Sequence, residues 1–275
     1  NPERDFPALH VAGTNGKGST CAFAAACLAT QGYRVGLYTS PHLLRVNERI
    51  KVSGEDISDA ALGRRVLEVL ELYPEAGAHP SPLTYFEFGT LLALWHFSRE
   101  KVDVAVLETG LGGRLDATTA ARPAVTAVTP ISFDHMDYLG HTLAAIAGEK
   151  AGIFKAGVPA VSSRQPPEVL EVLERVAREV GAPLSLEGRD FAFEEEPGEG
   201  AKTFAYRGIG ESRPARLRGF PARMRDWVHA DIGGALDFLA ARFPRHRVSA
   251  VGQSFGGQAL GAIEGNERIA SALMV

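Results

Sequence analysis

Cysteine, long apolar runs and surplus positive charge are all scarce in this sequence. Only Cys21 and Cys27 occur among 275 residues, six positions apart in a helical pattern, so they face different ways and a disulfide framework is excluded. A formal net charge of −4 gives no overall basic field for nucleic acid or an anionic membrane. No apolar run is long enough to span a membrane, and no signal-peptide pattern opens the chain. We therefore expect a cytoplasmic monomer that binds neither nucleic acid nor a membrane.

What the sequence does have is a regular alternation of apolar strands with amphipathic or alanine-rich helices. Strands are expected at 8–12, 34–38, 102–107, 125–128 and 158–162, and helices at 19–31, 60–72, 85–99, 143–154 and 168–180. Alternation of this kind predicts an α/β fold in which a mostly parallel sheet carries helices on both faces.

The pattern changes in the last third of the chain. Two short aromatic runs flank a polar stretch and predict a hairpin over 191–207, and the arginine-rich segment 213–225 has the composition of a linker. A helix at 227–243, a strand at 247–251, a tight turn at 252–257 and a helix from 258 onward are expected to follow. We therefore expect three parts, at 1–210, 211–225 and 226–275.

A glycine-rich turn follows the first strand and opens the first helix, with the sequence GTNGKGST at residues 13–20. Glycines let consecutive backbone amides face one anion, and the helix N-terminus adds a favourable dipole. Lys17 would reach the terminal phosphates of a nucleotide as a point charge. The alternative is a glycine-rich connection with a surface lysine, but the strand–turn–helix context favours nucleotide binding.

The spacing of this loop differs from the usual phosphate-loop motif. Val11 stands where that motif has its first glycine, and Gly18 separates Lys17 from the hydroxyl residues. The motif therefore does not require Ser19 to be a magnesium ligand.

Polar residues stand just past three of the predicted strands: Ser40, Glu108, Asp134 and His135. Carboxyl ends of parallel strands converge on a ligand crevice, where hydroxyl, carboxylate and imidazole groups together would hold Mg²⁺ beside a triphosphate. Three of these residues also have a simpler explanation. Ser40 would cap a turn and Glu108 would pair with Arg114. His135 would be a satisfied core histidine.

Lys150 lies within an apolar helical segment. A buried lysine costs free energy unless it is paired or chemically modified. An exposed or snorkelling lysine needs neither. The sequence leaves both interpretations open.

Seven motifs in order carry a resemblance to a known family. They are HVAGTNGKGST at 10–20, YTSPHL at 38–43, ERI at 48–50, LTYFEFGTLLAL at 83–94, DVAVLETGLGGRLDAT at 103–118, ISFDHMDYLG at 131–140 and GEKAGIFKAGVP at 148–159. Over about residues 1–210 the chain resembles folylpolyglutamate synthase/dihydrofolate synthase, a branch of the Mur ligase superfamily.

The resemblance implies a Mur ligase-type ATPase domain with a phosphate loop. Its expected reaction joins L-glutamate to dihydropteroate or to folates, with ATP and Mg²⁺. MgATP would phosphorylate a carboxylate of the pterin substrate, and the glutamate amine would then attack the acyl phosphate. Phosphorylation supplies the leaving group that a carboxylate lacks.

By motif position, the resemblance also implies roles for individual residues. The implied ATP phosphate cradle is Thr14, Asn15, Gly16, Lys17, Gly18 and Ser19, and the implied Mg²⁺ ligands are Ser40, Glu108 and His135. Lys150 matches a lysine that is carbamylated in the family, and the expected catalytic set is Lys17, His135 and Lys150. The implied pterin-binding surface includes Thr84, Tyr85, Phe86, Glu87, Arg114 and Asp116.

Three features depart from the family pattern. The chain begins nine residues before His10, Thr119 follows DAT where the family usually has asparagine, and the Asp-x-x-His-Asn-Pro motif of the family's C-terminal domain does not occur. We therefore expect the ATP-binding region to be N-terminally short and incomplete, with impaired ligase activity.

Residues 252–256 read G-x-S-x-G between a predicted strand and a predicted helix. This segment resembles the strand–elbow–helix of an α/β-hydrolase, with Ser254 as the nucleophile. No histidine follows Ser254 to complete a triad, so we expect the elbow to be silent. Two alternatives to the ligase remain open: a serine hydrolase that uses Ser254, and a catalytically inactive chimeric fragment.

Overall fold

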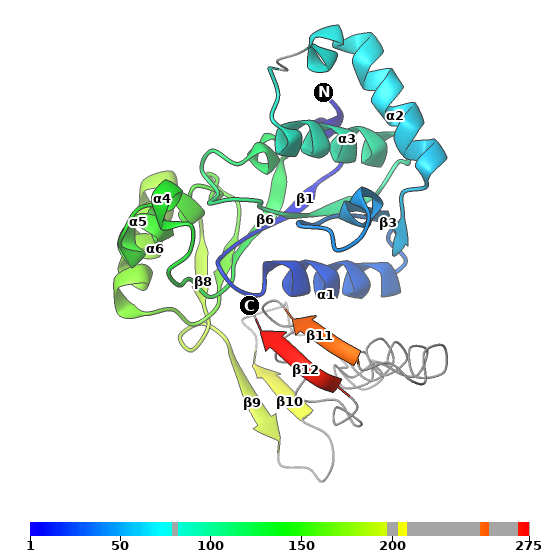
Figure 1. Ribbon diagram of the computed structural model, residues 1–275. Coiled ribbons are helices and arrows are strands. Elements are labelled where there is room, and N and C mark those ends of the chain that lie inside the picture. Colours follow the sequence, from blue (N-terminus) through cyan, green and yellow to red (C-terminus); the bar gives the residue numbers. More distant parts are fainter. Residues whose placement is uncertain (79–81, 197–202, 208–247, 253–268, 275) are drawn as a thin grey trace. The chain divides into compact units, whose positions relative to one another are not determined.

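The computed structural model describes residues 1–78, 82–196, 203–207, 248–252 and 269–274 (Figure 1). The chain divides into two compact units, Asn1–Glu187 and Gly188–Val275. The first unit holds every residue expected to bind phosphate, metal or pterin. Ser254, the expected linker at 213–225 and the expected helix at 227–243 lie outside the described residues.

The first unit is built on one eight-stranded sheet with the strand order β4-β3-β2-β5-β1-β6-β7-β8. All neighbours from β2 to β8 are parallel, whereas β3 and β4 run antiparallel at one edge. The strands are β1 (Ala8–Ala12), β2 (Val35–Tyr38), β3 (Ile50–Val52), β4 (Glu55–Asp56), β5 (Val104–Glu108), β6 (Pro123–Val128), β7 (Ala160–Ser162) and β8 (Leu184–Leu186). The expected α/β class with a mostly parallel sheet is confirmed.

Helices connect these strands and cover the sheet. The α-helices of this unit are α1 (Lys17–Thr30), α2 (Asp59–Leu72), α3 (Tyr85–Arg99), α4 (Met136–Leu139), α5 (Leu143–Ala151) and α6 (Pro167–Val180). Four 3₁₀ turns accompany them: η1 (Pro2–Arg4), η2 (Val46–Arg49), η3 (Pro74–Gly77) and η4 (Ala117–Ala120). α1 begins two residues earlier than expected because Gly16, with φ of 81°, caps it in the left-handed conformation.

Alternation along β1 sends its side chains to opposite faces of the sheet, where they join three buried clusters. Val11 packs with Cys21 and Ala25 of α1 on one face of the sheet. Ala8 belongs to the cluster under α3, and Ala12 to the cluster under α5 and α6. Helices therefore cover both faces, as the sequence predicts.

Phe97 anchors α3 to the sheet. Its side chain is fully buried, and its ring meets the edge of Phe6 with ring centroids 6.1 Å apart. Gly36 in β2 leaves the space that this ring fills, because a Cβ at that position would lie 2.8 Å from the Phe97 ring.

His10 is the polar member of β1 and is fully buried. Burial, and secondly the positive charge of Lys155, lower the pKa of His10 from 6.5 to about 4. The imidazole is therefore neutral in the folded protein at neutral pH.

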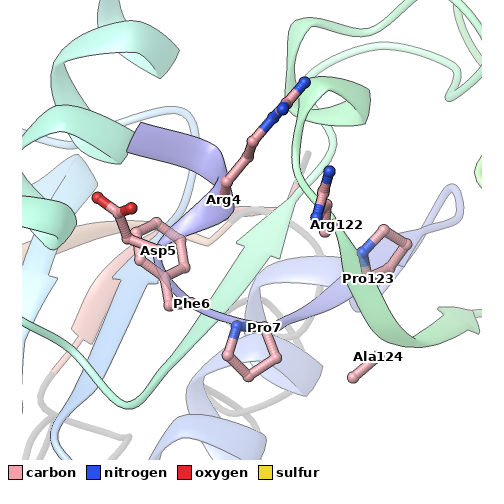
Figure 2. Close-up of a pocket in the computed structure, with 7 residues that line it drawn as sticks. All are labelled: Arg4, Asp5, Phe6, Pro7, Arg122, Pro123 and Ala124. Carbon is pink, nitrogen blue, oxygen red and sulfur yellow. The ribbon is translucent and has the colours of Figure 1, made fainter. Parts of the chain in front are cut away.

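A cavity of about 320 Å³ opens at the amino ends of β1 and β6, where Arg4 and Arg122 flank it (Figure 2). Asp5, Phe6, Pro7, Pro123 and Ala124 complete its lining. Because the strands are parallel, this cavity and the glycine-rich turn after β1 lie at opposite ends of the same strands. The cavity is thus separate from the candidate site described below.

The second unit contains two strand pairs in its described parts. β9 (Ala192–Glu196) and β10 (Thr203–Arg207) are antiparallel, which confirms the expected hairpin. β11 (Val248–Gly252) is parallel to β12 (Ile269–Met274). The expectation of helix from 258 onward is wrong for residues 269–274, since these six apolar and small residues pair with β11 as a strand.

Cys21 is buried and Cys27 is exposed, and both are free thiols, as the sequence predicts. In the described ranges, the helices are all too short or too polar to cross a membrane.

Replacing Phe97 with alanine should lower the free energy of unfolding by about 3–5 kcal/mol, because it empties a closed core position. Leu67 lies 69% exposed on α2, and its replacement with alanine should change stability by less than about 0.5 kcal/mol. Urea unfolding of both variants tests this, and equal effects would contradict the assigned core.

The pH dependence of stability should carry a contribution from His10. The unfolded state takes up a proton near pH 6.5, but the folded state does so only near pH 4, so stability is lost as the pH falls through this interval. The slope of this contribution should approach about 1.4 kcal/mol per pH unit. Urea titrations between pH 7 and 4 should show a flatter profile for His10→Gln, and an unchanged profile would show that His10 is not buried neutral.

Candidate functional site

Four adjacent strands bring the predicted site residues to one end of the sheet. β5 ends in Glu108 itself, while Ser40, Gly13 and the pair Asp134–His135 follow β2, β1 and β6, its neighbours in the order β2-β5-β1-β6. Tyr38 aligns with Leu107, Val11 with Glu108, and Ala12 with Val128, so the four strands end at nearly the same level. This is the end of a parallel sheet at which ligands bind.

The glycine-rich turn after β1 is shaped by its backbone. Gly13 has φ of 147°, and a Cβ there would lie 1.8 Å from the Thr129 hydroxyl oxygen, so only glycine fits. Gly16 caps α1, and the amides of residues 16–19 open the helix, where backbone amides have no partner within the helix. These amides are therefore available to an anion.

Thr14 and Asn15 tie the turn to the segment after β6. Their backbone amides both donate to the carbonyl of Pro130, at 3.0 and 3.2 Å. The Thr14 hydroxyl donates to the carbonyl of Ser132 at 3.1 Å, and the Asn15 amide group donates to the Ser132 hydroxyl at 3.2 Å. The Lys17 ammonium donates back to the Thr14 carbonyl at 3.2 Å, so it lies over the turn.

Glu108 lies buried between β2 and the start of α1. Its Oε2 accepts a hydrogen bond from the Ser40 amide at 2.9 Å, and a Cβ on Gly18 would lie only 3.4 Å from the same oxygen. Burial raises the pKa of Glu108, while the Ser40 amide and Lys17 oppose that rise. The alternative pairing of Glu108 with Arg114 is wrong, because Arg114 pairs with Glu149 at 2.9 Å.

His135 stands on the neighbouring loop and is not a core histidine. It caps α4 with φ of 47°, and its side chain is 55% exposed, with Nε2 3.6 Å from Asp134 Oδ2. In the described part of the chain, no hydrogen bond or ion pair joins His135 to Ser40 or Glu108, and no cluster of three or more His, Cys, Asp or Glu side chains forms a metal cage. The structure thus joins two of the three expected metal ligands directly.

Lys150 is buried and reaches the phosphate loop. Its ammonium donates to the Gly13 carbonyl at 2.7 Å. Burial first, and Lys17 second, lower the pKa of Lys150 to about 8, while Asp134 acts in the opposite direction. The interpretation as an exposed lysine is wrong, and its position beside Gly13 belongs to the site.

Two of the expected pterin-binding residues form the cap of α3. The Thr84 hydroxyl accepts from the Glu87 amide at 3.2 Å, and Glu87 Oε2 accepts from the Thr84 amide at 2.7 Å. These bonds make a capping box, and the Thr84 amide lowers the pKa of Glu87. Thr84 and Glu87 therefore fix where α3 starts.

Tyr85 and Phe86 point to different surroundings. Tyr85 is 63% exposed, and the guanidinium of Arg49 lies 5.4 Å from its ring centroid. Phe86 packs under the loop that follows β5, since a Cβ on Gly110 would lie 2.5 Å from its ring. The start of α3 and this loop are thus in contact.

Asp116 organises the loop after β5 from within. Its Oδ2 accepts from the amides of Gly110 and Leu111, each at 2.9 Å, and its Oδ1 accepts from the amide and hydroxyl of Thr118. The carboxylate is buried and its hydrogen-bonding capacity is used inside the loop. Arg114, in contrast, has its side chain 56% exposed.

Several residues that hold the candidate site together were not singled out from the sequence. Ser132 accepts hydrogen bonds from the side chains of Thr14 and Asn15. Gln165 joins the segments after β6 and β7: it accepts from the Ile131 amide and donates to the Thr129 carbonyl, both at 3.0 Å. Arg49 donates to His42 Nδ1 at 2.8 Å beside Tyr85. Its position after a strand could have singled out Ser132. The roles of Gln165 and Arg49 come from contacts with residues distant in sequence, which a sequence pattern does not reveal.

Comparisons with known proteins agree with this geometry. A dihydrofolate synthase/folylpolyglutamate synthase from Bacillus subtilis is 42% identical over 212 residues, covering 75% of this chain and 49% of its own length. A solved FPGS–AMPPCP–folate complex has a TM-score of 0.70 at 40% identity and covers 75% of this chain and 51% of its own. A bifunctional folylpolyglutamate synthase/dihydrofolate synthase from Yersinia pestis, solved with AMPPNP and a Mn ion, has a TM-score of 0.62 at 43% identity, covering 70% of this chain and 45% of its own.

The chain spans about half the length, or less, of the curated relatives that it matches. These relatives are synthases, and they give no support to the alternative of a serine hydrolase that uses Ser254. Residues 11–163 match the Mur ligase middle domain. Because this match covers more than half of the chain and includes the phosphate loop, Glu108 and Lys150, the chain belongs to the Mur ligase middle domain family.

Proposed function

We propose that this chain is the ATP-binding part of a ligase that joins L-glutamate to folates or dihydropteroate through an acyl phosphate. One observation carries the proposal. The buried carboxylate of Glu108 lies beside Gly18, in the first turn of the helix whose free amides and Lys17 would bind a triphosphate. A carboxylate there repels phosphate unless a divalent cation stands between them.

The phosphate loop supplies binding and charge neutralisation. Amides of residues 16–19 would donate to the phosphates, and Lys17 would move its ammonium from the Thr14 carbonyl to the terminal phosphate oxygens. Relatives solved with AMPPCP and with AMPPNP support this assignment.

The donor set beside the loop fits magnesium. Glu108 offers a carboxylate oxygen and Ser40 a hydroxyl, both hard oxygen ligands, and His135 on the next loop would complete the set. Bound Mg²⁺ would withdraw charge from the transferring phosphoryl group. The Mn ion in the Yersinia pestis relative supports a divalent cation in this family.

The proposed reaction makes a carboxylate reactive by phosphorylation. An oxygen of the substrate carboxylate attacks the γ-phosphorus, and ADP leaves. The glutamate amine then attacks the acyl carbon, phosphate leaves, and the amine loses a proton. The chain's own residues bind and orient the reacting groups and balance their charge.

The family resemblance assigns a carbamate to Lys150, and the geometry supports this part of the proposal. Burial lowers the pKa of Lys150 to about 8, which raises the share of neutral amine that is able to attack CO₂. The ammonium first loses one proton, and the neutral amine then forms an N–C bond to CO₂ and loses a second proton. Together these steps replace a cation beside Lys17 with an anion.

The pterin side of the proposal rests on the start of α3 and the loop after β5. The side chains of Tyr85 and Leu115 are exposed, by 63% and 79%. The guanidinium of Arg114, in the loop after β5, is half-exposed and pairs with Glu149 of α5. Apolar and aromatic surface with a nearby guanidinium suits a flat ring system that carries a carboxylate.

Replacing Lys17 with alanine should weaken MgATP binding at least about tenfold, a loss of about 1.4 kcal/mol, because the ammonium that faces the phosphates is removed. Isothermal titration with MgATP measures this. Lys101 precedes β5 at the other end of the sheet, so Lys101→Ala should bind as the wild type does. Equal affinity of the Lys17 variant and the wild type would refute nucleotide binding at this loop.

Replacing Glu108 with glutamine should separate the roles of metal and nucleotide. The amide oxygen is able to keep the bond from the Ser40 amide, but the charge that attracts Mg²⁺ is gone. Affinity for MgATP should fall at least about tenfold, while affinity for ATP in excess EDTA should stay equal or rise. Glu100→Gln, which alters an exposed pair with Arg34, should change neither value. Equal losses with and without metal would contradict a metal-binding Glu108.

A further inference from the structure

A chain of hydrogen bonds runs from the core of the sheet to the loop after β5. His10 Nε2 lies 2.7 Å from the Thr118 hydroxyl oxygen, and that hydroxyl lies 2.5 Å from Asp116 Oδ1. The other carboxylate oxygen of Asp116 receives the amides of Gly110 and Leu111. His10 and Thr118 are fully buried and Asp116 is nearly so.

The direction of each bond in this chain is fixed by chemistry. An ionised carboxylate only accepts, so the Thr118 hydroxyl donates to Asp116. The Thr118 oxygen must then accept from His10, which places the imidazole proton on Nε2. Nδ1 has no hydrogen-bond partner in the described part of the chain, which agrees with a neutral imidazole whose pKa is lowered to about 4.

The loop held by Asp116 connects the two sides of the candidate site. It starts two residues after Glu108, and its Gly113 lies against the helix that carries Lys150, where a Cβ would be 2.7 Å from the Lys150 carbonyl oxygen. The amide of Arg114 donates to the Glu149 carbonyl at 2.8 Å. Residues 110–116 therefore bridge the end of β5 and the end of α5.

The loop also presents side chains outward. Leu115 is 79% exposed and the Arg114 side chain is 56% exposed. Their positions follow from the backbone of residues 110–116, which the Asp116 carboxylate fixes through the amides of Gly110 and Leu111.

We propose that His10 and Thr118 are positioning residues, which hold the Asp116 carboxylate in the orientation that shapes this substrate-facing loop. The substrate-facing part rests on the proposed function, whereas the hydrogen-bond chain itself does not. His10 lies three residues before Gly13 on β1, so the same strand sets both the phosphate loop and the loop after β5. An apolar residue would fill the space of His10 at lower desolvation cost. The imidazole offsets that cost through the bond from Nε2 to the Thr118 hydroxyl, since Nδ1 has no partner in the described residues.

Thr118→Val keeps the shape of the side chain and removes the hydroxyl, and Thr118→Ser keeps the hydroxyl. The amides of Gly110 and Leu111 should exchange with solvent about five- to tenfold faster in Thr118→Val, which corresponds to the loss of one hydrogen bond. They should exchange near the wild-type rate in Thr118→Ser. His10→Met should behave like the valine variant, and His10→Gln, which keeps a donor, should behave like the wild type.

A second readout separates positioning from packing. Thr118→Val should raise KM for a folate substrate about five- to tenfold, with MgATP affinity by titration calorimetry unchanged and Thr118→Ser close to wild type. Unchanged amide exchange in Thr118→Val, or equal exchange in the valine and serine variants, would overturn the proposed positioning. Failure of the wild-type chain to bind MgATP would instead overturn the proposed function, and the exchange comparison would still decide the hydrogen-bond chain.

Discussion

A buried carboxylate at the start of α1 is the constraint on which the site depends. Glu108 occupies the end of β5, where the Ser40 amide holds one oxygen and the bare backbone of Gly18 allows the carboxylate to approach the helix. The helix N-terminus and Lys17 favour negative charge here, but a triphosphate in the same place needs a cation to share it with Glu108. The proposed metal dependence therefore follows from the arrangement of the strands.

The glycine-rich turn beside Glu108 is held by close packing and hydrogen bonds of its own. Gly13 lies against Thr129 with no room for a side chain, and the Lys150 ammonium donates to the Gly13 carbonyl. Because Thr14 and Asn15 are bonded to the segment after β6, the turn is tied to β6 as well as to its own strand. The phosphate loop thus joins the ends of β1 and β6 with α5, and its geometry does not depend on the missing first glycine of the usual motif.

Much of this arrangement was accessible from the sequence, and the exceptions have physical reasons. β1 and α3 were predicted at their observed bounds, since apolar runs and amphipathic spacing are local signals. α5 ends at Ala151, earlier than predicted, where the next residue packs directly on the loop after β5: a Cβ on Gly152 would lie 2.4 Å from Arg114 Cα. β3, β4 and β8 have only two or three residues, too few for a pattern of their own, and they were not predicted. β7 also has three residues but was predicted as part of the longer run 158–162.

The difference between local sequence signals and contacts between distant segments also applies to the site. Ser40 and Glu108 were predicted to lie together because strand ends in a parallel sheet converge, and the structure joins them directly. Asp116 was placed among the residues of the pterin site. Its carboxylate bonds within the loop to Thr118, whose hydroxyl oxygen lies 2.7 Å from His10 Nε2 of β1. A carboxylate's partners are set by three-dimensional contacts that motif order does not contain.

The central claim is that Glu108 and a bound triphosphate share one divalent cation. Its most direct test is a crystal structure of this chain with AMPPCP and Mn²⁺. The account predicts the terminal phosphates at the amides of residues 16–19, and an anomalous manganese peak within coordinating distance of the Glu108 carboxylate and the Ser40 hydroxyl. A nucleotide bound elsewhere, or phosphates at the loop with the cation away from Glu108, would contradict it.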